Sequence, residues 1–107
     1  RLIKPKAESK VLSFGNLSID IERCDVKNDS QVISLTNTEF QILTTLALTP
    51  GIVHTRESLI FKIIRDDVHV TNREIETHIA GLRKKLKEHS KLIKTIRGVG
   101  YRFQDNE

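Results

Sequence analysis

The sequence lacks the residues that build disulfide frameworks, aromatic cores or membrane spans. It contains a single cysteine, Cys24, so an internal disulfide is excluded, and a lone thiol suits a reducing compartment. Tryptophan and methionine are absent and aromatic residues make up 5% of the chain, which predicts a mostly aliphatic core. No apolar run approaches the roughly 20 residues of a transmembrane helix, and no signal peptide is visible. We therefore expect a soluble globular domain.

The length limits the number of domains that the chain can hold. Its 107 residues suit one domain with a single core. Residues 1–10 are charged, contain Pro5 and lack periodicity, so we interpret them as a linker to a missing upstream domain. Because position 1 is Arg, we expect a fragment of a longer protein. The folded domain is predicted over residues 11–104, with residues 105–107 as a tail.

The net charge of +4 is unevenly distributed along the chain. Residues 1–72 are neutral overall, whereas residues 73–102 carry nine basic and three acidic groups, a net charge of +6. A basic segment on a neutral body predicts a surface that binds a polyanion. The alternative is a lysine-rich helix face that is merely solvated.

The first third of the chain has the pattern of strands. Leu17, Ile19 and Ile21 alternate with polar residues, as in a half-buried strand. Gly15-Asn16 and residues 27–30 are turn signals on either side. The sequence therefore predicts a small antiparallel sheet over residues 11–35, with four strands.

The period then changes to that of helices. Thr36 and Glu39 fit a capping box that starts a helix over residues 37–48, which Pro50 and Gly51 end. Thr55 is the N-cap candidate of a short helix over residues 56–64.

The strongest periodic signal lies further on. A second capping-box pattern at residues 71–74 precedes Ile75, Ile79, Leu82 and Leu86, which share one helical stripe. This pattern predicts a helix over residues 72–88. Two short strands around Gly98-Val99-Gly100 then predict a β-hairpin.

This order of elements is typical of a winged helix-turn-helix, an α+β fold. The fold would comprise an N-terminal four-stranded antiparallel sheet, three helices and a C-terminal β-hairpin wing. The major groove of B-DNA admits one α-helix, which must present a polar face to the base edges. Opposite the apolar stripe of the 72–88 helix lie Arg73, Thr77, Ala80, Gly81 and Lys84.

Small residues between the two cations would let the backbone approach the groove. Gly81 costs about 1 kcal/mol within a helix, which close approach to DNA would explain. Close packing against another protein element is the alternative. His78, Arg83, Lys85 and Lys87 flank this face and suit phosphate contacts. At the hairpin turn, Arg97 can enter an adjacent minor groove, the alternative being a solvated arginine.

Four segments together resemble one family. They are residues 35–40 (LTNTEF), the helix start at residues 56–59 (RESL), residues 78–86 (HIAGLRKKL) and residues 95–103 (TIRGVGYRF). In this order and spacing they resemble the OmpR/PhoB-type effector domain of bacterial response regulators, over about residues 11–104.

The resemblance implies a cytoplasmic, bacterial DNA-binding domain that regulates transcription in a two-component phosphorelay. It implies that residues 72–88 are the recognition helix, with DNA contacts from Arg73, His78, Arg83 and Lys84. Thr95, Arg97 and Tyr101 would contact DNA from the wing region, with Arg97 in the minor groove. The loop over residues 65–71, which includes Arg65, Asp66, Asp67, Val68, His69 and Val70, is the element that touches RNA polymerase in activators.

The resemblance also implies assembly on DNA. The family binds direct repeats of double-stranded DNA as a head-to-tail dimer under the control of an upstream receiver domain. We expect the isolated domain to be monomeric.

Three departures from the family pattern stand out. Ile64 and Arg65 replace a frequent Trp-Gly pair, which puts the loop geometry in question. Ala80 and Gly81 stand where relatives often present polar base readers, so more of the recognition would rest on DNA shape and on the wing. Asp66 and Asp67 make the loop acidic.

Other classes of function have little support in the sequence. The four histidines have no partner at metal-ligand spacing, so we expect neither a metal nor another cofactor. No catalytic constellation is visible, which predicts that the protein is not an enzyme. Phe14, Phe40, Phe61 and Phe103 are interpreted as core residues. The competing hypothesis is a winged-helix module that binds proteins and no longer binds DNA.

Overall fold

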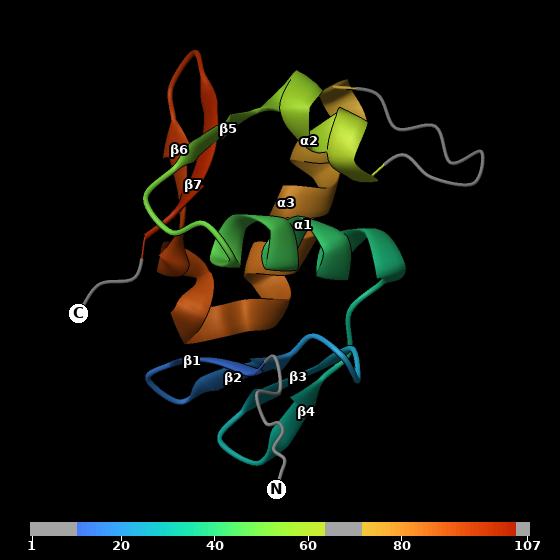
Figure 1. Ribbon diagram of the computed structural model, residues 1–107, viewed down its shortest axis with the longest axis vertical. Coiled ribbons are helices and arrows are strands. Elements are labelled where there is room, and N and C mark those ends of the chain that lie inside the picture. Colours follow the sequence, from blue (N-terminus) through green and yellow to red (C-terminus); the bar gives the residue numbers. More distant parts are fainter. Residues whose placement is uncertain (1–10, 64–71, 105–107) are drawn as a thin grey trace, which may run out of the picture. The chain divides into compact units, whose positions relative to one another are not determined.

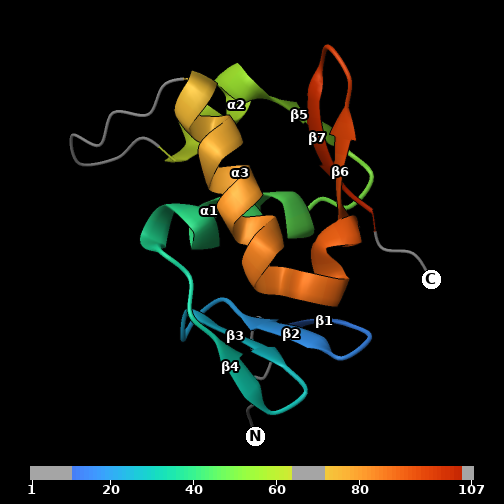
Figure 2. The ribbon, with the colours of Figure 1, turned by 180° about the vertical axis from the view of Figure 1, so that it is seen from behind.

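The computed structural model describes residues 11–63 and 72–104 of the chain, which divides into two compact units at the boundary between Ser34 and Leu35 (Figures 1 and 2). The first unit is an antiparallel sheet in the order β1-β2-β3-β4. Its strands are β1 (Val11–Phe14), β2 (Leu17–Asp20), β3 (Asp25–Asn28) and β4 (Gln31–Ile33). This confirms the prediction of four strands. Ile19 faces Val26 in the register of β2 and β3, and both are buried, as the period of two requires.

The second unit contains three helices, a short 3₁₀ helix and a three-stranded sheet. The helices are α1 (Asn37–Ala47), α2 (Arg56–Ile63) and α3 (Asn72–Leu86), and η1 (Lys87–Leu92) follows α3. The strands β5 (Val53–Thr55), β6 (Ile93–Ile96) and β7 (Gly100–Phe103) form an antiparallel sheet in the order β5-β7-β6. The hairpin β6–β7 is the predicted wing. Among the described residues, no helix is both long and apolar enough to span a bilayer.

Helices α1 and α2 begin where the sequence predicts, each with an N-cap hydrogen bond. The Thr36 hydroxyl accepts from the backbone N–H of Glu39, and the Glu39 carboxylate accepts from the backbone N–H of Thr36, which completes the capping box. Thr55 accepts from the backbone N–H of Ser58 at 3.0 Å, as an N-cap does. Thr71, the first residue of the second predicted capping box, lies outside the described residues.

The core of the second unit lies between the three helices, which all contact one another. The predicted stripe of α3, Ile75, Ile79, Leu82 and Leu86, is fully buried. The α-helix ends two residues earlier than predicted, because Lys87 has a φ of 55°, in the left-handed region that interrupts an α-helix.

Two features of this unit differ from the predictions. Strand β5 was not predicted, because three residues are too short for alternation to show, and pairing with β7 defines it. The interpretation of Phe61 as a core residue is wrong: its side chain is 83% exposed on α2, whereas Phe103 is fully buried.

Candidate nucleic-acid interface

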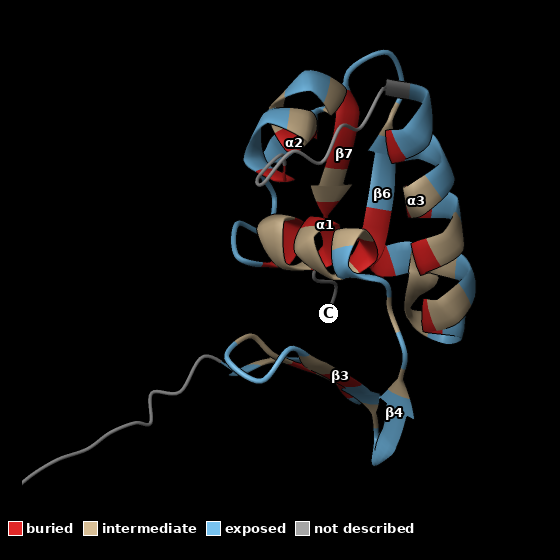
Figure 3. Cartoon of the chain, turned by 90° about the vertical axis from the view of Figure 1, so that its right-hand side faces the viewer, coloured by how far each residue is buried: buried red, intermediate tan, exposed pale blue. Residues whose placement is uncertain are grey.

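The side of α3 opposite its buried stripe forms an open strip. Arg73, Thr77, Ala80 and Lys84 are all exposed and follow one another at steps of four, three and four residues. Figure 3 shows that exposed and buried positions alternate along α3, as on a helix with one buried side. The Thr77 hydroxyl donates to the Arg73 carbonyl at 3.3 Å, so it is held against the helix. The strip therefore presents two cations separated by small side chains.

Gly81 and Lys85 lie on a different side of α3, beside α1. A Cβ atom on Gly81 would lie 2.7 Å from Oε2 of Glu39, and Nζ of Lys85 bonds Oε1 of the same carboxylate at 2.7 Å. The DNA contacts predicted for both residues stay a prediction, and the structure adds a contact within the protein for each of them. Gly81 leaves room for a protein carboxylate, which was the alternative stated above. Lys85 neutralises that carboxylate, because a buried charge requires a partner.

The sequence did not predict that Glu39 contacts Gly81 and Lys85 of α3. The Glu39 side chain is 7% exposed although it carries a charge. Burial raises the pKa of the carboxyl, but the hydrogen bonds from Lys85 and Thr36 and the charge of Lys85 lower it further, so that the pKa lies below its ordinary value of 4.5. The capping-box pattern located Glu39 but gave no sign of a partner 46 residues further along the chain.

Stability should depend on this carboxyl in acid. Because the folded-state pKa of Glu39 lies below 4.5, its stabilising effect is complete above that pH and is lost as the pH falls through the folded-state value. We expect Glu39→Gln to lose about 1 to 3 kcal/mol at neutral pH and to approach the wild type below pH 4.5. Urea denaturation over a pH series measures both. Glu57→Gln, at an exposed carboxylate, is the control, and a constant difference at every pH would contradict the assignment.

Arg83 connects α3 to the wing. Its Nη2 atom donates to the carbonyl of Ile93 at 2.8 Å and to the hydroxyl of Thr95 at 2.7 Å, while Nε donates to the same carbonyl at 3.3 Å. The guanidinium carbon lies 5.9 Å from the ring centroid of Tyr101. Three predicted site residues, Arg83, Thr95 and Tyr101, are thus brought together.

The DNA contacts predicted for Arg83 and Tyr101 stay a prediction, and the structure shows how both residues are held within the protein. Tyr101 is only 5% exposed, and its ring lies beside the guanidinium of Arg83. Arg83 is half-buried and bonded within the protein. Thr95 stays exposed at the base of the wing, and His78 is half-buried on α3.

The tip of the wing is open. Arg97 and Val99 are exposed, and the N–H of Val99 donates to the carbonyl of Ile96 at 2.9 Å to close the turn. Gly98 has a φ of 76°, which a tight turn of this kind requires at its third position. The wing tip and the start of α3 lie toward the same end of the second unit (Figures 1 and 2).

Gly100 does not share the role of Gly98 in the turn. Its φ is not positive, so it does not serve the turn. A Cβ atom at this position would lie 2.0 Å from the carbonyl oxygen of His54, because β5 passes directly against β7.

Residues 64–71 lie outside the described part of the chain. The predicted polymerase-contact loop therefore stays a prediction, as does the effect of the Ile64-Arg65 departure. Within the described part of the chain, no group of three or more histidine, cysteine, aspartate or glutamate residues could hold a metal ion.

Residues 30–103 match the family described as "Transcriptional regulatory protein, C terminal". The chain belongs to this family. One relative is the heme response regulator HssR of Staphylococcus saprophyticus, to which the chain is 37% identical over 97 residues. The match covers 89% of this chain and 43% of that protein. The chain is 33% identical over 105 residues to the phosphate regulon transcriptional regulatory protein PhoB of Escherichia coli, covering 96% of this chain and 46% of that protein. The chain spans less than half the length of these relatives.

Solved structures of the family share the fold. The response regulator DrrB of Thermotoga maritima, an OmpR/PhoB homologue, has a TM-score of 0.78 and 37% identity over 88% of this chain and 44% of its own. The RstA DNA-binding domain of Klebsiella pneumoniae, in complex with the RstA box, has a TM-score of 0.77 and 30% identity over 91% of this chain and 99% of its own. The fold is thus the winged helix of OmpR/PhoB-type DNA-binding effector domains.

Proposed function

We propose that this chain is the sequence-specific DNA-binding effector domain of a bacterial two-component response regulator that controls transcription in the cytoplasm. The observation that carries the proposal is the exposed strip of α3, with a cation at either end, beside a wing whose tip presents Arg97. The helix would lie in the major groove, with Arg73 and Lys84 on phosphates and Thr77 and Ala80 near the base edges. Arg97 would enter the adjacent minor groove.

Further parts of the proposal rest on family membership. An upstream receiver domain would control head-to-tail dimerisation on direct repeats, and residues 65–70 would contact RNA polymerase. Family membership and the fold support a regulatory rather than an enzymatic role.

Binding to duplex DNA at two salt concentrations tests the proposal. Contacts with phosphates release counterions, so fluorescence anisotropy should show an affinity that falls as salt rises. A duplex selected from a random-sequence library should bind more tightly than an unrelated duplex of the same length. Absence of binding at low salt, or binding that is insensitive to salt, would support the protein-binding module instead.

Lys84→Ala should weaken binding about equally on all duplexes. Lys84 is exposed on the strip and would contact a phosphate, so its loss should reduce the slope of log affinity against log salt by about 1. Lys27→Ala, at an exposed lysine of β3 in the first unit, is the matched control. An unchanged slope would remove Lys84 from the interface.

Arg97→Ala should weaken binding to some duplexes more than to others. Narrow A·T-rich minor grooves concentrate negative potential, so the loss of affinity should be largest, about tenfold, for duplexes with an A·T-rich flank beside each half-site. The measurement compares duplexes that differ only in their flanks. An equal loss on all of them would indicate an ordinary phosphate contact.

A further inference from the structure

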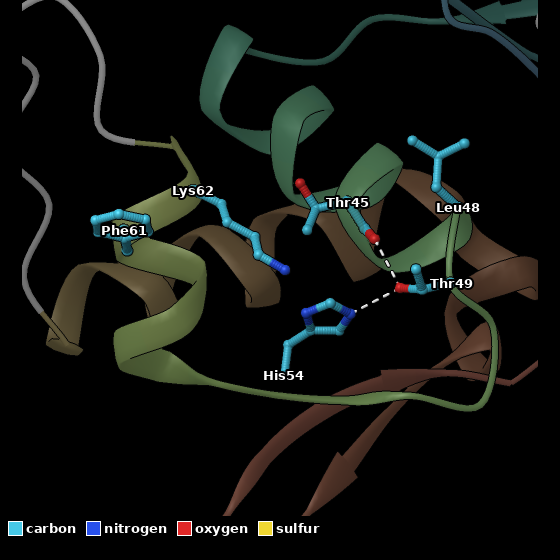
Figure 4. Close-up of a pocket in the computed structure, with 6 residues that line it drawn as sticks. All are labelled: Thr45, Leu48, Thr49, His54, Phe61 and Lys62. Carbon is cyan, nitrogen blue, oxygen red and sulfur yellow. Dashed lines mark hydrogen bonds between the residues drawn. The ribbon is translucent and has the colours of Figure 1, made fainter.

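A pocket of about 470 Å³ lies in the second unit, and none of its lining residues belongs to α3 or to the wing. It is formed by the end of α1, by β5 and by α2, and Figure 4 shows its lining residues: Thr45, Leu48, Thr49, His54, Phe61 and Lys62. Its size is in the range of sites that bind small ligands. The proposed DNA interface does not use any of these residues.

The hydrogen bonds of the pocket fix the proton on His54. The Thr49 hydroxyl donates to the carbonyl of Thr45 at 3.2 Å, so its single proton is used there. Its bond with Nε2 of His54, at 2.8 Å, must then be accepted by the hydroxyl and donated by the ring. In the neutral ring, Nδ1 is therefore an acceptor with a free lone pair.

His54 is held neutral by its surroundings. The residue is 4% exposed, and burial together with the positive charge of Lys62 lowers the pKa of its imidazole below the ordinary value of 6.5. Thr45 faces it from α1, Thr49 from the segment just after α1, Lys62 from α2 and Tyr101 opposite it in β7. Among the described residues that line the pocket, Lys62 carries a positive charge, and none is a carboxylate that would balance this charge.

Apolar side chains border the charged part of the pocket. Leu48 is 54% exposed and Phe61 is 83% exposed, and both line the pocket. Leu48 and Phe61 thus give the pocket an apolar border that a ligand could contact. A cation beside an apolar border is complementary to a carboxylate that carries an apolar group.

We propose that this pocket binds a carboxylate attached to an apolar group. The ammonium of Lys62 pairs with the carboxylate, and Leu48 and Phe61 cover the apolar part. Because the lone pair on Nδ1 would repel an anion, binding is coupled to uptake of one proton from solvent by Nδ1 of His54, which then donates to the carboxylate. The same chemistry is offered by a free organic acid and by an acidic side chain beside an apolar one in another protein.

Titration of the chain with matched acid and amide probes, followed by NMR, tests the proposal. One arm uses phenylacetate against phenylacetamide, and the other uses the blocked peptide acetyl-Leu-Glu-Leu-amide against its glutamine counterpart. The acid of at least one arm should bind about tenfold more tightly than its amide, since a hydrogen bond between charged groups is lost in the amide. Binding in the first arm alone identifies a free acid as the source, and binding in the second identifies a protein segment.

Proton uptake gives a second readout. Affinity for the acid probe should increase about tenfold between about pH 7.5 and about pH 5.5, and the His54 ring should titrate at a higher pH when the probe is bound. His54→Gln assigns its signal among the four histidines. Lys62→Gln, at an exposed residue that should not affect folding, should weaken the acid about tenfold, whereas Lys91→Gln should not.

Three results would overturn the proposal. They are equal binding of acid and amide in both arms, an affinity for the acid that does not change with pH, and no binding up to about 20 mM, well above the millimolar dissociation constants expected of such small probes.

Discussion

Replacing Gly100 by alanine is expected to destabilise the domain by at least about 3 kcal/mol, at the upper end of the effects of overpacking. The new Cβ would lie 2.0 Å from the carbonyl oxygen of His54 and 2.8 Å from Cα of Thr55. Both are backbone atoms of β5, so relief requires β5 to separate from β7. Thermal denaturation should show a fall in Tm of more than about 12 °C.

Gly98→Ala is the matched control for this variant. Gly98 has a φ of 76° and no atom within 4 Å of the position of a new Cβ, so its replacement tests backbone strain without a steric clash. We expect a loss of about 1 to 2 kcal/mol there. A similar, small loss for both variants would mean that β5 can yield to a side chain at position 100.

Replacing Arg83 by alanine is expected to weaken binding to a selected duplex about 10- to 100-fold, given the DNA-binding function proposed above. The variant loses three hydrogen bonds to β6 and the contact with the Tyr101 ring. Hydrogen bonds from a charged group contribute about 1.5 to 3 kcal/mol, which corresponds to this range of affinity. Without them, the wing is no longer fixed relative to α3, and the two cannot engage adjacent grooves together.

Arg83→Lys separates this positioning role from a phosphate contact. Lysine keeps the positive charge but lacks the planar fork that bonds Ile93 and Thr95 together. We expect Arg83→Lys to bind the selected duplex nearly as poorly as the alanine variant while its salt dependence stays that of the wild type. Recovery of affinity with lysine would show that charge alone is required. Anisotropy titrations at several salt concentrations measure both quantities.

Patterns confined to a few neighbouring residues predicted most of the fold. The capping box at Thr36 and Glu39 and the stripe from Ile75 to Leu86 are local, since both depend on the geometry of one helix. Turn signals and the period of two likewise predicted the four-stranded sheet and the hairpin, and the family resemblance implied both in the same order. Strand β5 could not be predicted, because only its pairing with β7, far along the chain, makes three residues a strand.

The sequence predicted the exposure of site residues that face outward better than the contacts of those that pack against a second element. The positions of Arg73, Thr77, Lys84 and Arg97 follow from helix period and turn chemistry, and all four are exposed. Lys85 looks identical to Lys84 in sequence, yet it bonds Glu39 of α1. The two residues are one position apart, which is about 100° around the helix axis. Lys85 therefore contacts the carboxylate of Glu39, whereas Lys84 points into solvent.

The strand order β5-β7-β6 has a consequence for how the wing is made during translation. The central strand, β7, is the last of the three in the sequence, and it also accepts from the N–H of Gly51 through the carbonyl of Phe103. Neither β5 nor β6 has a partner until residues 100–103 have left the ribosome, although α1, α2 and α3 have by then emerged. The helices can therefore assemble during synthesis, whereas the three-stranded sheet must wait for its final strand, so a nascent chain whose residues from Gly100 onward are still inside the ribosome would expose α3 without a formed wing.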